Sequence, residues 1–145
     1  MNSWIKAVAS FFYVGFLPKA PGTFGSLAGL ILAWFLNPNI VFILSALSII
    51  GFVISPAARI AFRQDDPKEF VIDEVTGMML TVLWLPKKLV LFILGFLIFR
   101  VLDIWKPWPI RLIQKNKNAL SIMWDDLAAG FFANLILQSL LKFQS

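Results

Sequence analysis

The run Ile40-Val-Phe-Ile-Leu-Ser-Ala-Leu-Ser-Ile-Ile-Gly-Phe-Val-Ile54 decides the class of fold. It contains no charged side chain, and it continues past Pro56 into Ala57–Phe62, a segment flanked by Arg59 and Arg63. A helix needs about 20 mainly apolar residues to cross the hydrocarbon core of a bilayer. The run therefore predicts a membrane-spanning helix with a basic end.

Further apolar runs lie on both sides of this one, and turn signals such as Asn37-Pro38-Asn39 and Pro86-Lys87-Lys88 separate them. These runs are Ser26–Leu36, Phe70–Leu85, Leu89–Leu102 and Leu120–Leu141. Together with the first run, they predict an all-α, polytopic helical membrane protein with about five membrane helices.

The N-terminal part has a different character. Met1–Phe16 mixes polar and aromatic residues, which is typical of an interfacial or re-entrant segment. Leu17–Gly25 contains two prolines and two glycines, which predicts an irregular turn. At the depth of the membrane, irregular backbone is tolerated only where protein buries it or where it lines a cavity. No repeat divides the chain, so residues 1–145 are predicted to form a single domain.

The composition supports a membrane protein and excludes several kinds of chemistry. Hydrophobic residues make up 59% of the chain and charged residues 14%, whereas about a quarter of a soluble domain is charged. Cysteine and histidine are both absent, which excludes thiolate or histidine metal sites and cysteine or histidine nucleophiles. The net charge of +5 is interpreted as basic loops that meet anionic headgroups. No nucleic acid and no obligate protein partner are predicted.

The distribution of charge predicts an orientation. If the turn at Thr23 lies inside, ten of the thirteen lysines and arginines lie inside, and only Lys87, Lys88 and Lys142 lie outside. Cytoplasmic loops carry such an excess of positive charge. All eight carboxylates then lie toward the same face as the ten basic residues.

Five of these carboxylates fall at the ends of predicted spans, and they are candidates for function: Asp73, Glu74, Asp103, Asp125 and Asp126. An ionisable group inside a span costs about 2.5–3.5 kcal/mol on insertion scales, so such groups usually serve a purpose. Clustered carboxylates must be protonated, paired or neutralised by a cation, and an oxygen-only ligand set suits Mg²⁺, Mn²⁺ or Ca²⁺. The three remaining acids are interpreted as solvated loop residues: Asp65, Asp66 and Glu69.

Basic residues stand beside these acids. Arg100 precedes Asp103 by three residues, which also suits a simple intrahelical ion pair. Lys106 precedes Pro107, so we expect it to leave the regular helix and to be able to reach a phosphate. The turn at Thr23 either offers N–H groups to an anion or is a helix cap formed by Thr23 or Ser26.

Four motifs resemble those of the phosphatidylglycerophosphatase A family, and the resemblance runs from about Gly15 to Gly130. The motifs are Ala20-Pro-Gly-Thr-Phe-Gly-Ser-Leu27, Ile72-Asp-Glu-Val-Thr-Gly-Met79, Phe99-Arg-Val-Leu-Asp-Ile-Trp-Lys-Pro-Trp-Pro-Ile110 and Ile122-Met-Trp-Asp-Asp-Leu-Ala-Ala-Gly130. The resemblance implies a Mg²⁺-dependent, multi-pass enzyme of the bacterial inner membrane with its active site toward the cytoplasm. The substrate that the resemblance implies is the lipid phosphatidylglycerol phosphate, and the implied product is phosphatidylglycerol, the precursor of cardiolipin.

The resemblance also suggests roles for individual residues. The expected catalytic group is Asp73, Asp103, Lys106 and Thr23. The expected phosphate-binding group is Thr23, Arg100 and Lys106. The expected metal ligands are Glu74, Asp103, Asp125 and Asp126. Attack on phosphorus by water is preferred over attack by a carboxylate, because the D-x-D spacing of aspartyl-phosphate enzymes is absent.

Three other functions would account for some of the same features. A cation-coupled transporter or channel also uses intramembrane acids, but its acids should line a path through the midplane, whereas these lie toward one face. A non-catalytic scaffold leaves the clustered acids unexplained. A CDP-alcohol phosphotransferase needs a denser set of spaced aspartates on a single segment.

Overall fold

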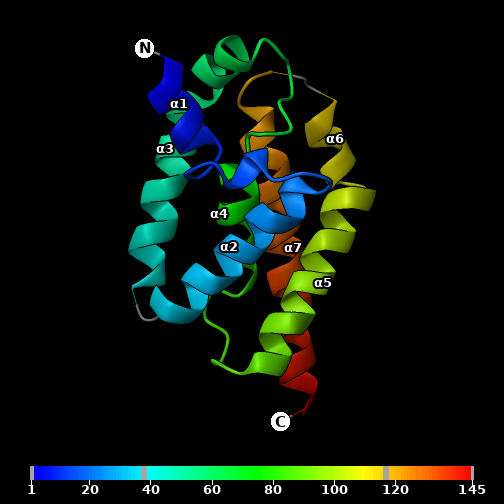
Figure 1. Cartoon of the computed structure of the whole chain (residues 1–145). Coiled ribbons are helices and arrows are strands. Elements are labelled where there is room, and N and C mark those ends of the chain that lie inside the picture. The colour runs from blue at the N-terminus through cyan, green and yellow to red at the C-terminus, as the bar shows by residue number, and fades with distance from the viewer. Residues whose placement is uncertain (1, 37–38, 116–117, 145) are drawn as a thin grey trace.

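The computed structural model describes residues 2–36, 39–115 and 118–144, and within these ranges every regular element is a helix (Figure 1). The elements in chain order are α1 (Asn2–Ala9), the 3-10 helix η1 (Val14–Phe16), α2 (Pro21–Leu36), α3 (Ile40–Phe62), α4 (Ile72–Thr81), α5 (Leu89–Trp105), α6 (Ile110–Gln114) and α7 (Ser121–Gln144). The all-α prediction is confirmed for the described residues.

Among the described residues, two helices are long and apolar enough to cross a membrane. They are α3, with 23 residues, and α7, with 24 residues. α3 runs without a break through Pro56, as the sequence predicted. α2 and α5 are shorter, with 16 and 17 residues. Of the roughly five membrane helices that the sequence predicts, two are therefore long and apolar enough to cross a membrane within the described residues.

α4 is a short helix in the centre of the bundle. Eight of its ten residues are buried, and α2, α3, α5 and α7 surround it (Figure 1). Ten residues rise only about 15 Å, half of a hydrocarbon core about 30 Å thick. The predicted span Phe70–Leu85 is therefore a half-length helix with turns at both ends, enclosed by protein.

Side chains of α7 satisfy the backbone where α4 ends. The Asn134 side-chain amide donates to the carbonyl oxygens of Thr81 at 3.0 Å and Leu83 at 2.8 Å. The Gln138 amide also donates to Leu83, at 3.4 Å. Carbonyl groups that leave a helix at membrane depth need such partners, because the bilayer core offers no water.

Two boundaries differ from the sequence prediction. The irregular turn expected over Leu17–Gly25 ends at Ala20, because Pro21 opens α2. Proline suits the first position of a helix, where its missing N–H is not needed. The expected loop Trp105–Asn118 contains α6. The turn predicted at Asn37-Pro38-Asn39 lies largely outside the described residues.

The two ends of the bundle and its outer surface differ in chemistry. The segment after α3, together with α1 and α6, lies at one end, whereas the turn after α4 and the C-terminus lie at the other (Figure 1). Between the ends, large apolar side chains of the outer helices are exposed, among them Phe35, Phe42, Val53, Val90, Leu97 and Leu140. A soluble monomer rarely exposes so much contiguous apolar surface, and these faces are suited to lipid.

We expect Asn134→Ala to lower the free energy of unfolding by about 1–3 kcal/mol, because the carbonyls of Thr81 and Leu83 lose their donor in a water-poor site. Thermal unfolding in detergent measures the change. Ser139→Ala is the matched control, since the exposed Ser139 hydroxyl donates only within its own helix, to Leu135. Equal melting temperatures for the two variants would contradict this account of the α4 terminus.

Candidate active site

The site is built on a close crossing of α4 and α7. A Cβ atom added at Gly130 would lie 2.3 Å from the carbonyl oxygen of Gly77, and one added at Gly77 would lie 2.7 Å from the carbonyl oxygen of Asp126. The two backbones are therefore in direct contact. Gly77 follows Asp73 by one helical turn, and Gly130 follows Asp126 by one turn. The crossing thus brings these two acids together.

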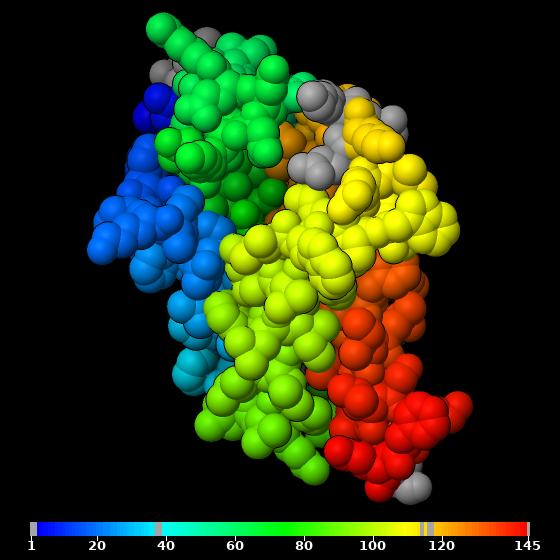
Figure 2. All heavy atoms as spheres, turned by 90° about the vertical axis from the view of Figure 1, so that its right-hand side faces the viewer, coloured from blue at the N-terminus to red at the C-terminus, as the bar shows by residue number. Residues whose placement is uncertain are grey.

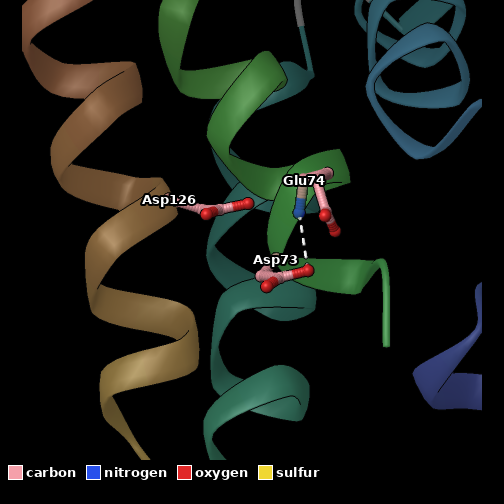
Figure 3. A group of neighbouring side chains, drawn as sticks. All are labelled: Asp73, Glu74 and Asp126. Carbon is pink, nitrogen blue, oxygen red and sulfur yellow. Dashed lines mark hydrogen bonds between the residues drawn. The ribbon is translucent and has the colours of Figure 1, made fainter. Parts of the chain in front are cut away.

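Asp73, Glu74 and Asp126 form a compact carboxylate group, called here the acid trio. Each contributes an oxygen, and these oxygens lie within 4.8 Å of one another. Figure 3 shows the first two side chains leaving the start of α4 and meeting the third from α7. The Glu74 backbone N–H donates to Asp73 Oδ1 at 2.9 Å. Such a group could hold a metal ion.

Two oxygens of the acid trio are buried without a hydrogen-bond partner. They are Glu74 Oε2 and Asp126 Oδ2, and the Asp126 residue is only 3% exposed. Buried polar atoms are nearly always paired, so an unpaired one calls for a ligand, an ion or a water molecule. Three carboxylates that face one another favour a cation. The donor set therefore fits a hard divalent metal.

Lys106 is the centre of a second group of carboxylates. Its Nζ lies 3.3 Å from Asp103 Oδ1, 3.0 Å from Asp125 Oδ2 and 4.0 Å from Asp126 Oδ1. Lys106 follows the last residue of α5 in a left-handed conformation, with φ 49°, so it does leave the regular helix as predicted. Burial alone would lower the pKa of Lys106, but the three aspartates outweigh burial and raise this pKa above its usual range. The side chain is therefore a permanent cation.

Arg100 and the start of α2 complete the surroundings. Arg100 Nη1 lies 2.6 Å from Asp103 Oδ2, the intrahelical pair that the spacing allowed. A Cβ atom at Gly22 would lie 3.0 Å from Glu74 Oε1 and 3.3 Å from Arg100 Nη1, so α2 begins directly against the site. Ser26 does not cap the helix, because its hydroxyl donates back to the Gly22 carbonyl at 2.8 Å. Thr23 lies next to Gly22 in the first turn of α2.

A cavity of about 720 Å³ leads to these residues from the end of the bundle that carries α6. The five candidate acids and Lys106 line it, and so do Asp65 and Asp66, whereas among the described residues Thr23 and Arg100 do not. Arg59, Arg111 and Lys115 add positive charge to its walls. Figure 2 shows the segment after α3 and α6 on either side of this hollow, with the start of α7 between them.

The three loop acids do not behave alike. The Asp65 side chain is 98% exposed and lies 4.0 Å from Arg59, and Asp66 is also exposed. These two fit the interpretation as solvated residues. Glu69 does not fit it, because its Oε2 is buried without a hydrogen-bond partner. The backbone of Glu69 packs against Gly15, where an added Cβ would lie 2.1 Å from the Glu69 carbonyl oxygen.

Sequence reasoning named every acid of the site but missed the residues that place them. Gly22, Gly77 and Gly130 lie inside the quoted motifs, and the spacing of four residues from Asp73 to Gly77 and from Asp126 to Gly130 was a usable signal. Arg111 and Lys115 have helical i, i+4 spacing, which would place them on one face.

The fold and this site define a helical membrane protein with a buried acidic centre that could hold a metal. A family model described as Phosphatidylglycerophosphatase A matches residues 7–141. The chain therefore belongs to the phosphatidylglycerophosphatase A family, and it is a phosphatase.

Two curated relatives agree with the family model, and both are named phosphatidylglycerophosphatase A. The relative from Escherichia coli is 36% identical over 143 residues, covering 94% of this chain and 82% of the relative. The relative from Haemophilus influenzae is 34% identical over 139 residues, covering 91% of this chain and 85% of the relative. No solved structure matches the chain.

We expect Gly130→Ala to lower the free energy of unfolding by about 1–3 kcal/mol or more, because its methyl group meets the backbone of Gly77, which cannot rotate away. Gly51→Ala is the matched control on α3, since its methyl group would meet the flexible end of Met123. Thermal unfolding in detergent compares the two. A melting temperature lowered more by the Gly51 variant would contradict the importance of the α4–α7 crossing.

Proposed function

We propose that this protein hydrolyses the terminal phosphate monoester of phosphatidylglycerol phosphate, giving phosphatidylglycerol and inorganic phosphate, with Mg²⁺ as cofactor. The acid trio with its two unpartnered oxygens, beside the half-buried cation of Lys106 that lines the same cavity, carries this proposal. Anionic ligands for a metal and a fixed positive charge for phosphate then meet in one place. Phosphoryl transfer depends on this combination.

The proposed metal ligands are Asp73, Glu74 and Asp126. Mg²⁺ prefers oxygen ligands and usually keeps one or two carboxylates together with waters and substrate phosphate. When bound, it would polarise the phosphoryl oxygens and offset their charge. Asp103 and Asp125, first expected among the metal ligands, are assigned instead to holding Lys106, because both lie within hydrogen-bonding distance of its Nζ.

The remaining roles fall to the basic residues and to the start of α2. Lys106 lines the cavity, and Arg100 is paired with Asp103, which also lines it, so that their charge would attract the phosphate group. Thr23 would contribute its hydroxyl from the first turn of α2. Asp103, held by both cations, positions them. A carboxylate of the site takes a proton from the attacking water as the water oxygen forms a bond to phosphorus. The bond from phosphorus to the glycerol oxygen breaks, and the carboxylic acid returns its proton to this leaving oxygen.

The substrate lipid reaches this site from the side of the bundle. Ile104 lines the cavity and is 71% exposed on the outer face of α5, and Trp105 and Trp108 beside it are also exposed. Tryptophan is enriched where membrane meets water. The acyl chains would stay in the bilayer beside Ile104 while the headgroup enters the cavity.

We further propose that α2, α3, α5 and α7 all traverse a bacterial inner membrane, with α4 reaching only part of the way. The cavity end then faces the cytoplasm. The distribution of basic residues supports this orientation, because the sequence predicts ten of the thirteen toward that face. The location of the acids at one end also counts against a conducting path through the midplane.

The test is phosphate release from phosphatidylglycerol phosphate by purified protein in detergent. We expect release with Mg²⁺, none with EDTA, and a loss of about 100-fold or more in Asp103→Asn, because Arg100 and Lys106 lose the charge that positions them. Lys68→Gln, at an exposed loop residue that does not line the cavity, is the control and should retain activity. A folded, Mg²⁺-loaded sample that releases no phosphate would refute the proposed function.

A further inference from the structure

The acidic centre consists of two groups of carboxylates that share Asp126. On one side lies the acid trio, with Glu74 Oε2 and Asp126 Oδ2 unpartnered. On the other side, Asp126 Oδ1 lies 4.0 Å from the ammonium of Lys106. Asp126 thus turns one oxygen toward Lys106 and leaves the other without a partner. A carboxylate shared between neighbouring cations is the usual arrangement in enzymes with two metal ions.

The group around Lys106 has the form of a cation site. Asp103 from α5 and Asp125 and Asp126 from α7 converge on a single point, which the Nζ atom occupies at 3.3, 3.0 and 4.0 Å. All three aspartate side chains are shielded, with exposed fractions of 10%, 13% and 4%. Three shielded carboxylate oxygens around one point would attract a hard divalent ion if the ammonium were not there.

The backbone at Lys106 turns away from α5. Its φ of 49° is left-handed, a conformation in which glycine is favoured after the end of a helix. A lysine is strained there. From this turn the ammonium reaches Asp125 across the bundle, at 3.0 Å.

We propose that the protein binds one divalent cation per chain, at the acid trio, and that the Lys106 ammonium occupies the position a second cation would otherwise take. This inference deepens the proposed function and rests on its metal. Lys106 provides the fixed charge of the missing ion. Its two donors to Asp103 and Asp125 leave a third N–H free to meet a phosphate oxygen.

The test counts Mn²⁺, a hard and paramagnetic probe, on the purified full-length protein in detergent. We expect calorimetric titration to give one Mn²⁺ per chain for the wild type, with the electron paramagnetic resonance spectrum of an isolated ion. Lys106→Ala should bind two, with a spectrum of spin-coupled neighbours. The control Lys68→Ala, in an exposed loop, should bind one. Two ions in the wild type, none in the wild type, or one in a folded Lys106→Ala would overturn the inference.

A pair of aspartate variants decides the matter if Lys106→Ala does not fold. Asp73→Asn removes a ligand from the acid trio and should weaken Mn²⁺ binding about tenfold or more. Asp125→Asn affects only the group around Lys106 and should change the affinity much less. The reverse order would overturn the inference. Phosphate release is measured separately, so one bound Mn²⁺ without release refutes the function, whereas two with release refutes only the inference.

Discussion

Everything at the centre of this protein depends on the contact between the backbones of α4 and α7 at Gly77 and Gly130. Two helices normally lie 8–10 Å apart, and the absence of side chains at these positions allows a closer approach. In a membrane, small residues at helix contacts take the place of the hydrophobic effect, because lipid is as apolar as leucine. The contact lies one turn from Asp73 and from Asp126. The same backbone contact therefore determines how the two helices pack and where these two acids lie.

The short length of α4 follows from the position of its acids beside this contact, inside the bundle. A helix that crossed the whole bilayer would place its first turn, and its acids, at the membrane surface. α4 instead starts inside the bundle, where α2, α3, α5 and α7 shield it, and Asn134 and Gln138 satisfy the carbonyls near its far end. Phe70 and Val71, which lead into it, are buried as well. The acids are thus removed from bulk water while the cavity keeps them accessible.

Charge balance accounts for the rest of the site. Five carboxylates in a low-dielectric interior repel one another strongly, and each added cation reduces that repulsion. Arg100 and Lys106 supply two positive charges from the end of α5, and both bond to Asp103. A hard divalent metal ion at the acid trio would offset most of the remaining negative charge. The site is therefore stable only as a set of opposite charges, which explains why α5 carries a cation on each side of its aspartate.

The sequence by itself determined the class of protein, the acids and their common face. Apolar runs are lengths of chain that must be shielded from water, and charges near their ends are costly, so both can be recognised without coordinates. The sequence alone could not show that Phe70–Leu85 contains a helix of only ten residues. A run of apolar residues has the same composition whether lipid or protein surrounds it. Only the tertiary structure decided which acids lie together in the acid trio and which hold Lys106. That division depends on distances between helices far apart in the chain, and the crossing at Gly77 and Gly130 sets those distances.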